Sequence, residues 1–237
     1  MRLVLFDIDG TLMLTGGAGM RAFHRALAQV FDIPVDREVI RPDGKTDPLI
    51  AREFLRHFGQ ESRWNEDSRD ALFHLYVSYL EEEMKTAQER KSIRILPGVR
   101  ELLDILVAQK DFTLGLVTGN LEQGAQIKLR SVGLAHYFRF GGYGSDSEDR
   151  TTLIRKAIQR GIQHVSPARM EAAFVIGDTP LDIIHGKAAG ASVIAVASAR
   201  YGATDLHSHN PDLLVSDLTP VETILSFMRA QPRTSTH

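Results

Sequence analysis

Hydrophobic and polar residues alternate along this chain in two different ways, and the change lies near residue 96. Beyond that point, short apolar runs alternate with stretches whose apolar residues recur at helical spacing. The short apolar runs predict strands at 113–117, 172–176 and 192–196, and more weakly at 137–140 and 213–214. The helical spacing predicts helices at 99–108, 122–132, 151–160, 181–189 and 220–228. Alternation of this kind predicts right-handed β-α-β units, and therefore an α/β fold with a doubly wound parallel sheet.

Residues 15–95 follow a different pattern, in which helical spacing dominates and no strand of similar strength intervenes. A first apolar run at 3–6 precedes them and predicts the opening strand of the sheet. The helical stretch therefore interrupts the sheet just after that strand. We predict a core formed by residues 1–14 and 96–230, an inserted helical domain formed by residues 15–95, and a disordered tail at 231–237.

Polar residues follow on three of the predicted strands. In chain order they are Asp7 and Asp9, then Thr118 and Asn120 with Gly119 between them, and then Asp178 after Gly177. Asp182 lies four residues beyond Asp178, so both carboxylates can face one ligand across the turn into the next helix. Because the carboxyl ends of parallel strands meet at one edge of a sheet, we expect these side chains to lie close together.

Each of these motifs also has a simpler interpretation. Asp7 and Asp9 could belong to a solvated turn or a calcium loop, although the further acids of an EF-hand are missing. Thr118 and Asp178 could be no more than helix N-caps, with Gly119 as a turn residue. Against this, two nearby acids repel each other and are costly to bury, which a cation would relieve. A hydroxyl and exposed amide hydrogens at the end of a strand also suit a phosphate oxygen.

Taken together, three motifs resemble the signature of the haloacid dehalogenase-like superfamily. They are Asp-x-Asp-Gly-Thr at 7–11, Thr-Gly-Asn at 118–120 and Gly-Asp-x-x-x-Asp at 177–182. The chain is similar to the Mg²⁺-dependent phosphatases of that superfamily, in the branch of phosphoglycolate phosphatase and β-phosphoglucomutase. The resemblance implies a helical cap over a Rossmann-like core, Mg²⁺ as cofactor and a small-molecule phosphate ester as substrate.

The resemblance also implies a role for each residue at this sheet edge. Asp7 is expected to attack phosphorus and form an aspartyl-phosphate, while Asp9 protonates the leaving oxygen and later takes a proton from water. Asp7, the backbone carbonyl of Asp9 and Asp178 are expected to hold Mg²⁺. Asp182 would order a metal-bound water or the phosphate-binding arginine. The phosphoryl oxygens are expected to contact Thr118, Gly119, Asn120 and Arg150.

Two basic residues are candidates for contact with the substrate. The family pattern places a lysine or arginine before the helix that leads to the last acidic strand. Arg150 is our candidate because it stands at the start of that predicted helix, whereas Arg155 and Lys156 lie inside it. Arg130 is a further rival. Lys45 lies in a Gly-Lys-Thr-Asp segment that resembles the specificity loop of phosphoglycolate phosphatase-like members, so it either contacts substrate or faces solvent.

Composition limits the kinds of molecule that the protein is expected to bind. The 237 residues carry a net charge of −2, so no basic surplus favours nucleic acid or an anionic membrane. The chain has no cysteine, which excludes disulfides and thiolate chemistry. No apolar run has the length of a membrane span and nothing resembles a signal peptide, so we expect a cytoplasmic enzyme. His207, His209 and Asp212 do not complete a zinc site and are expected at the surface.

The sequence therefore predicts a Mg²⁺-dependent phosphatase that acts on a small metabolite such as phosphoglycolate or a sugar phosphate. Asp9 favours this reaction over dehalogenation, because a halide leaves without a proton. Two alternatives stay open. A phosphomutase of the β-phosphoglucomutase type shares all the core residues, and a non-enzymatic phospho-acceptor or Mg²⁺-binding module would be phosphorylated on Asp7. The pattern does not indicate an oligomeric state.

Overall fold

The computed structural model describes residues 1–34, 39–166 and 169–231. Within these ranges six strands form one sheet in the order β5-β4-β1-β6-β7-β8, and every neighbouring pair is parallel. The strands are β1 (Arg2–Phe6), β4 (Phe112–Val117), β5 (Gly141–Gly142), β6 (Ala172–Gly177), β7 (Ser192–Val196) and β8 (Leu213–Val215). The predicted doubly wound α/β fold is confirmed. Of the predicted tail, residues 232–237 lie outside the described residues.

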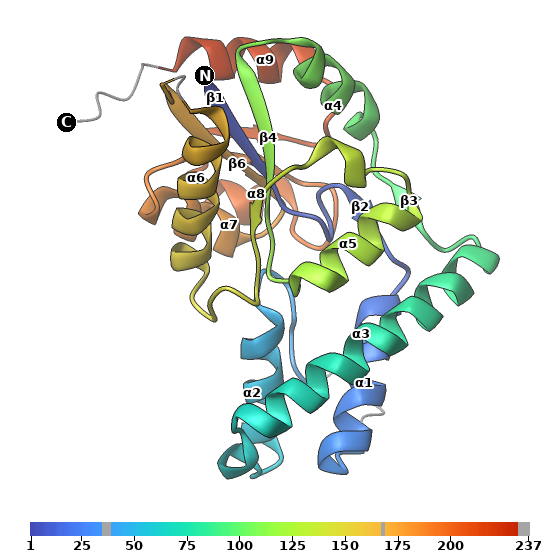
Figure 1. The fold of residues 1–237 in the computed structure, drawn as a ribbon. Helices are drawn as coiled ribbons and strands as arrows, with labels where there is room; N and C mark the ends of the chain where they lie inside the picture. The colour runs from blue at the N-terminus through green and yellow to red at the C-terminus, as the bar shows by residue number, and fades with distance from the viewer. Residues whose placement is uncertain (35–38, 167–168, 232–237) are drawn as a thin grey trace.

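Helices cover both faces of this sheet (Figure 1). One face packs against α4 (Val99–Ala108), α5 (Glu122–Ser131) and α9 (Val221–Ala230), and the other against α6 (Arg150–Val165), α7 (Pro180–Ala188) and α8 (Ala203–His207). The strand pleat explains the division, since alternate side chains of a strand point to opposite faces. Val4 and Phe6 of β1 join the first apolar core, and Leu3 and Leu5 join the second.

The predicted strand at 137–140 is wrong. Its first residue ends the short helix η2 (Ala135–Tyr137), and the edge strand is instead β5, which consists of two glycines. A strand without side chains gives no hydrophobic period, so the pattern did not reveal it. A Cβ on Gly142 would lie 2.1 Å from the carbonyl oxygen of Leu153, so α6 packs directly against the backbone of this strand.

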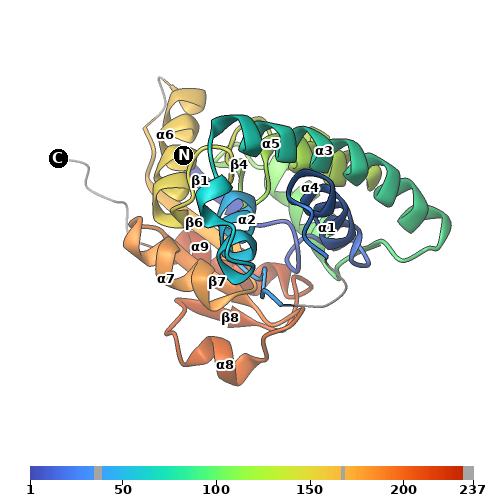
Figure 2. The same ribbon diagram turned by 90° about the horizontal axis from the view of Figure 1, so that it is seen from below.

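The segment between β1 and α4 is helical, as its pattern predicts. It contains α1 (Ala18–Phe31), α2 (Asp47–His57), η1 (Glu61–Arg63) and α3 (Glu66–Glu89), and these lie beyond the carboxyl ends of the strands (Figures 1 and 2). The buried rings of Phe23 on α1 and Tyr76 on α3 pack edge to face, with centroids 4.9 Å apart. Whether this segment forms a separate cap stays a prediction.

A small antiparallel sheet marks the two ends of the helical segment. β2 (Met13–Leu14) pairs with β3 (Arg94–Ile95), so the chain leaves and re-enters the core at one place. The hydrophobic pattern did not predict these two short strands, nor α8. In the described ranges, no helix is both long enough and apolar enough to cross a bilayer.

Candidate active site

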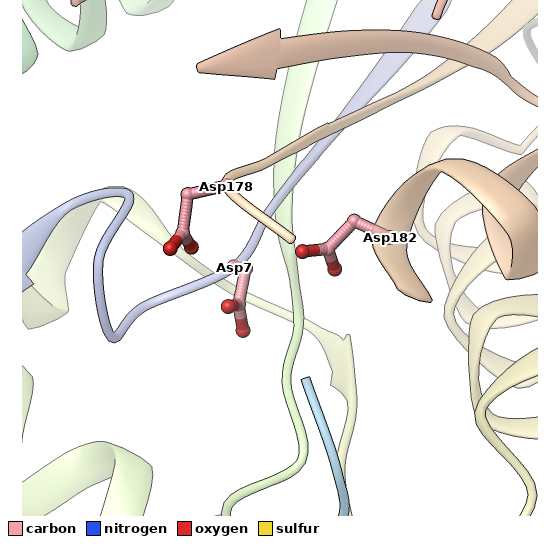
Figure 3. Close-up of side chains that lie close together, drawn as sticks. All are labelled: Asp7, Asp178 and Asp182. Atoms are coloured by element: carbon pink, nitrogen blue, oxygen red, sulfur yellow. The ribbon is translucent and has the colours of Figure 1, made fainter. Parts of the chain in front are cut away.

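Three buried carboxylates meet where β1 and β6 end (Figure 3). Asp7 follows β1, Asp178 follows β6, and Asp182 lies in the first turn of α7. Each contributes an oxygen that lies within 4.8 Å of the other two. Among the described residues this is the only such group of three or more acids, histidines or cysteines. The predicted meeting of these strand ends is therefore what the structure shows.

The charges of this cluster are poorly compensated. Burial raises the pKa of Asp7 from 3.8 to about 7, and the neighbouring Asp182 and Asp9 add to the rise although Arg150 opposes it. Burial also raises the pKa of Asp178, and Asp182 and Asp7 add to that shift. A divalent cation between these oxygens would remove both the repulsion and the proton affinity. The hard, all-oxygen donor set is the kind that Mg²⁺ prefers.

The first motif is held in place by its glycine and threonine. Gly10 has a φ of +89°, which favours glycine, and a Cβ there would lie 2.3 Å from Oδ2 of Asp178. The loop after β1 can therefore pass directly over the Asp178 carboxylate. The Thr11 hydroxyl donates to Oδ1 of Asp178 at 3.0 Å. Residues 10 and 11 of the motif thus fix an acid that lies 167 residues further along the chain.

Asp182 uses both of its oxygens inside the protein. Its Oδ2 accepts from the backbone N–H of Thr179 at 3.0 Å and from the Thr179 hydroxyl at 2.7 Å, in a capping box that begins α7. Its Oδ1 accepts a hydrogen bond from Arg150. Of the two tasks that the resemblance implies for Asp182, the geometry shows direct contact with the arginine.

Arg150 is the one of the four basic candidates that reaches the acidic cluster. It is the first residue of α6, is 4% exposed, and places Nη2 3.5 Å from Oδ1 of Asp7. Burial would lower its pKa, but Asp182 and Asp7 outweigh that effect and raise it. Its Nε is buried and has no hydrogen-bond partner within the described part of the chain. The rivals lie elsewhere: Arg155 donates to the carbonyl of Ala188, Lys156 donates to the carbonyl of Asp146, and Arg130 is exposed.

The segment after β4 lines the same cavity. Thr118 is fully buried, and its Oγ1 accepts from Nδ2 of Asn120 at 2.7 Å. Gly119 approaches the helical segment so closely that a Cβ would lie 1.9 Å from the carbonyl oxygen of Lys45. Only glycine fits at this contact.

Asp9 is held by two donors, one of which the sequence analysis missed. Asn120 Nδ2 and Lys128 Nζ both donate to Oδ2 of Asp9, at 2.8 and 2.6 Å. Lys128 also donates to Oδ1 of Asn120 at 2.6 Å, which closes a ring of three side chains. A signal was present in the sequence, since Lys128 lies three residues after the buried Ala125 on the apolar face of α5. A lysine in such a stripe must lie against the core or a site.

The start of α2 brings the helical segment onto this sheet edge. The backbone N–H of Asp47 donates to the carbonyl of Gly119, and the Asp47 carboxylate accepts from the N–H of Leu121, both at 2.8 Å. Burial raises the pKa of Asp47 to about 6, although Lys128 opposes the shift. The Lys45 ammonium points to a different partner, Oε2 of Glu53, at 2.5 Å. Lys45 therefore lines the cavity with its charge already paired.

These residues enclose a cavity of about 170 Å³. The sheet edge contributes the acids and the segment after β4, together with Lys128 and Arg150. The helical segment closes it with residues of α1, α3 and the loop before α2, among them Met20, Phe23, Lys45 and Tyr76. A site of this size, with acids and cations at the sheet edge and both apolar and charged groups on the helical segment, suits a small polar ligand.

Comparisons with known proteins agree with this chemistry. The family described as "Haloacid dehalogenase-like hydrolase" matches residues 4–196. Pyrophosphatase PpaX of Bacillus thuringiensis (strain Al Hakam) is 25% identical over 234 residues, which span 95% of this chain and 96% of that protein.

Two solved structures share the fold. A predicted phosphoglycolate phosphatase from Haemophilus somnus 129pt has a TM-score of 0.62 at 20% identity, and the match covers 94% of this chain and 97% of that one. A provisionally assigned β-phosphoglucomutase from Thermotoga maritima has a TM-score of 0.61 at 20% identity, with 95% and 99% covered.

Proposed function

Because the chain belongs to the haloacid dehalogenase-like hydrolase family, as its motifs predict, we propose that it is a Mg²⁺-dependent phosphatase that hydrolyses a small phosphorylated metabolite through an aspartyl-phosphate. The observation that carries the proposal is the set of groups around Asp7. This buried carboxylate lies within 4.8 Å of the Asp178 carboxylate and 3.5 Å from the Arg150 guanidinium. A nucleophile, a metal ligand and an anion-binding cation thus meet at one point.

Mg²⁺ would be held by the carboxylates of Asp7 and Asp178 and by the backbone carbonyl of Asp9. When bound, it neutralises the repulsion between an anionic nucleophile and an anionic substrate. The raised pKa values of Asp7 and Asp178 support this assignment, because both carboxyls are buried beside other acids with too few cations nearby.

Asp7 begins the reaction. One of its oxygens attacks phosphorus as the bond from phosphorus to the leaving oxygen breaks. Asp9 gives the leaving oxygen a proton, and the product alcohol departs. Asp9 then takes a proton from a water that attacks the aspartyl-phosphate, and inorganic phosphate leaves as the Asp7 carboxylate is restored. The cavity position of Asp9, whose side chain is 41% exposed, suits a group that exchanges protons with ligands.

Four residues are proposed to hold the phosphoryl oxygens as their charge shifts. Arg150 supports this best, since its buried Nε has no partner among the described residues and can donate to an anion. Thr118 offers a hydroxyl at the cavity wall, and Gly119 and Asn120 line the same wall. Asp182 keeps the guanidinium in place through its hydrogen bond with Arg150.

Residues 15–95 are proposed to act as the cap of this site. The first residue of α2, Asp47, contacts the segment after β4 through two hydrogen bonds, and α1 and α3 supply the opposite wall of the cavity. Closure of these groups over bound substrate would exclude water before the attack. Lys45 is proposed as a substrate contact of this cap.

The test is multiple-turnover release of inorganic phosphate from p-nitrophenyl phosphate, phosphoglycolate, pyrophosphate and sugar phosphates. We expect release in Mg²⁺, none in EDTA, and none with the Asp7→Asn variant. Isomerisation of a sugar phosphate without net phosphate release would identify a phosphomutase instead. Incorporation of a single equivalent of phosphate without turnover would identify a phospho-acceptor module, and either result would overturn the proposal.

A further inference from the structure

One buried cation of the cavity has no role in the chemistry proposed above. The side chain of Lys128 is only 5% exposed, although lysine is almost never buried without a partner or a function. Lys128 lines the cavity, and its ammonium lies at the end of a stem that passes through the apolar face of α5. A methionine or leucine would fill that face without the cost of burying a charge. Packing alone therefore does not explain a lysine at this position.

The partners of the two buried cations do not overlap. Arg150 contacts Asp7 and Asp182, whereas Lys128 contacts Asp9 and Asn120. In an in-line displacement the attacking and leaving oxygens lie at opposite ends of the phosphoryl group. Asp7 stands at the attacking end and Asp9 at the leaving end. Lys128 is thus placed beside the leaving group and not beside the phosphoryl group.

The distances limit what Lys128 can reach. Its Nζ lies 2.6 Å from Oδ2 of Asp9. A leaving oxygen that accepts a proton from Asp9 lies about 2.7 Å from the donating carboxylate oxygen, so Nζ is within about 5.5 Å of it through Oδ2 and within about 7.5 Å through Oδ1. An ammonium has three N–H donors, and Asp9 and Asn120 accept two of them. The third can serve a group that is bonded close to the leaving oxygen.

The surroundings make this ammonium effective for an anion. Gly19, in the first turn of α1, lies so close that a Cβ on it would be 3.3 Å from Nζ, so the helical segment shields the charge from water. Charge interactions strengthen as water is excluded. Both lysines of the cavity are paired with one carboxylate, Lys128 with Asp9 at 2.6 Å and Lys45 with Glu53 at 2.5 Å, but only Asp9 is proposed to meet the leaving oxygen.

We propose that Lys128 is a specificity-determining residue that binds an anionic group on the leaving group, a carboxylate or a phosphate next to the scissile oxygen. The inference rests on the proposed phosphatase function and narrows its substrates to phosphates of α-hydroxy acids or to pyrophosphate-like compounds. A phosphate on the far side of a sugar ring lies beyond the reach of Nζ. Because Lys128 also donates to Asp9, it can contact the substrate and the proposed acid at the same time.

The experiment compares substrates that differ only in this anionic group. Phosphoglycolate and 2-hydroxyethyl phosphate are matched in length, and one carries a carboxylate where the other carries a neutral hydroxymethyl group. We expect the wild type to prefer phosphoglycolate or pyrophosphate in kcat/KM. Lys128→Met should reduce that preference by about 10- to 100-fold, which is the value of one charged hydrogen bond. Pyrophosphate serves as the second arm, and the larger preference identifies the anion as carboxylate or phosphate.

Two controls keep the comparison sharp. Arg130→Met removes an exposed charge from the same helix and should leave the preference unchanged. Lys128→Arg retains the charge and should retain most of the preference. If Lys128→Met unfolds, as judged by circular dichroism, Lys128→Gln provides the same comparison. A second readout is calorimetric binding to the Asp7→Asn protein in Mg²⁺, where Lys128→Met should weaken phosphoglycolate and spare 2-hydroxyethyl phosphate.

The results that would contradict the role of Lys128 differ from those that would contradict the phosphatase function. Equal losses on both matched substrates would show that Lys128 only positions Asp9, and a wild type without preference for a charged leaving group would also overturn the inference. In either case phosphate would still be released, so the phosphatase proposal would stand. A wild type that releases phosphate from no substrate, p-nitrophenyl phosphate included, would overturn both.

Discussion

The two buried cations of the cavity differ in how the chain holds them. Arg150 begins a helix, and the fully buried Asp182 and the carbonyl of Gly44 accept its hydrogen bonds. Lys128 lies in the middle of a helix, and one of its two acceptors is Asp9, whose side chain is 41% exposed. The attacking end of the site is therefore fixed by buried groups, whereas the leaving end faces the ligand. We expect the first to serve every substrate and the second to distinguish among them.

The largest effect is expected at the leaving end, from Asp9→Asn. The amide cannot donate a proton as an acid does, so kcat on 2-hydroxyethyl phosphate should fall by about 10²- to 10⁴-fold. p-Nitrophenyl phosphate should lose less, because nitrophenolate leaves without a proton. Steady-state kinetics on both substrates measure the difference. Equal losses on the two would contradict the assignment of Asp9 as the acid.

The attacking end is tested by Arg150→Met. The substitution should lower kcat/KM by about 10²- to 10³-fold on every substrate, charged or neutral in its leaving group. It should also lower the free energy of unfolding by about 3–5 kcal/mol, because Asp182 is left buried and uncompensated. Urea titration gives the stability. Arg155→Met is the matched control from the same helix. A loss of activity confined to one class of substrate would contradict the expectation that Arg150 acts on every substrate.

Asp47 links the helical segment to the leaving end, and its burial gives a pH-dependent test. Because burial raises its pKa from 3.8 to about 6, the folded protein holds this proton more tightly than the unfolded chain does. Ionisation therefore destabilises the fold progressively between about pH 4 and pH 6, and the penalty is constant above that range. Asp47→Asn keeps an oxygen that can accept from Leu121 and removes the penalty.

We thus expect the Asp47→Asn protein to be more stable than the wild type at pH 7, by about 2–3 kcal/mol. The gap should close as the pH falls towards 4. Urea unfolding between pH 4 and pH 8 measures it, and Asp70→Asn, an exposed acid on α3, is the control. A gap that is the same at every pH would argue against the buried carboxylate as its source.

The smallest effect is expected from Lys45→Met. Its ammonium is already paired with Glu53, so a substrate anion would compete with that carboxylate for it. KM for phosphoglycolate should therefore change by less than about fivefold. A loss as large as that of Lys128→Met would mean that the anionic leaving group is held by the cap and not by α5.

The sheet edge was predictable because its signals are local. Each acid follows an apolar run, and the parallel topology that brings the ends of such runs together follows from the alternation of strand and helix. Arg150 was also within reach of the sequence, since it stands at the first position of α6. That it pairs with Asp182 depends on packing between α6 and α7.

The leaving end was less predictable because its contacts join distant parts of the chain. Lys128 meets Asp9 across 119 residues, and Leu121 meets Asp47 across 74. A lysine on an apolar helix face marks an inward position but does not name its partner. Lys45 was predicted to contact substrate or face solvent, and that stays a prediction; the structure adds that its ammonium pairs with Glu53 of α2 at the cavity wall.

The most direct test is to look for phosphate on Asp7. The protein, with Mg²⁺, is mixed with a substrate labelled in its phosphoryl group, quenched in acid within one turnover, and digested for mass spectrometry. We predict a phosphate on the peptide that contains Asp7, labile to hydroxylamine as an acyl phosphate is and absent in Asp7→Asn. With p-nitrophenyl phosphate, whose leaving group needs no proton, it should accumulate further in Asp9→Asn. Turnover without any label on Asp7, or a label on another residue, would contradict the proposed mechanism.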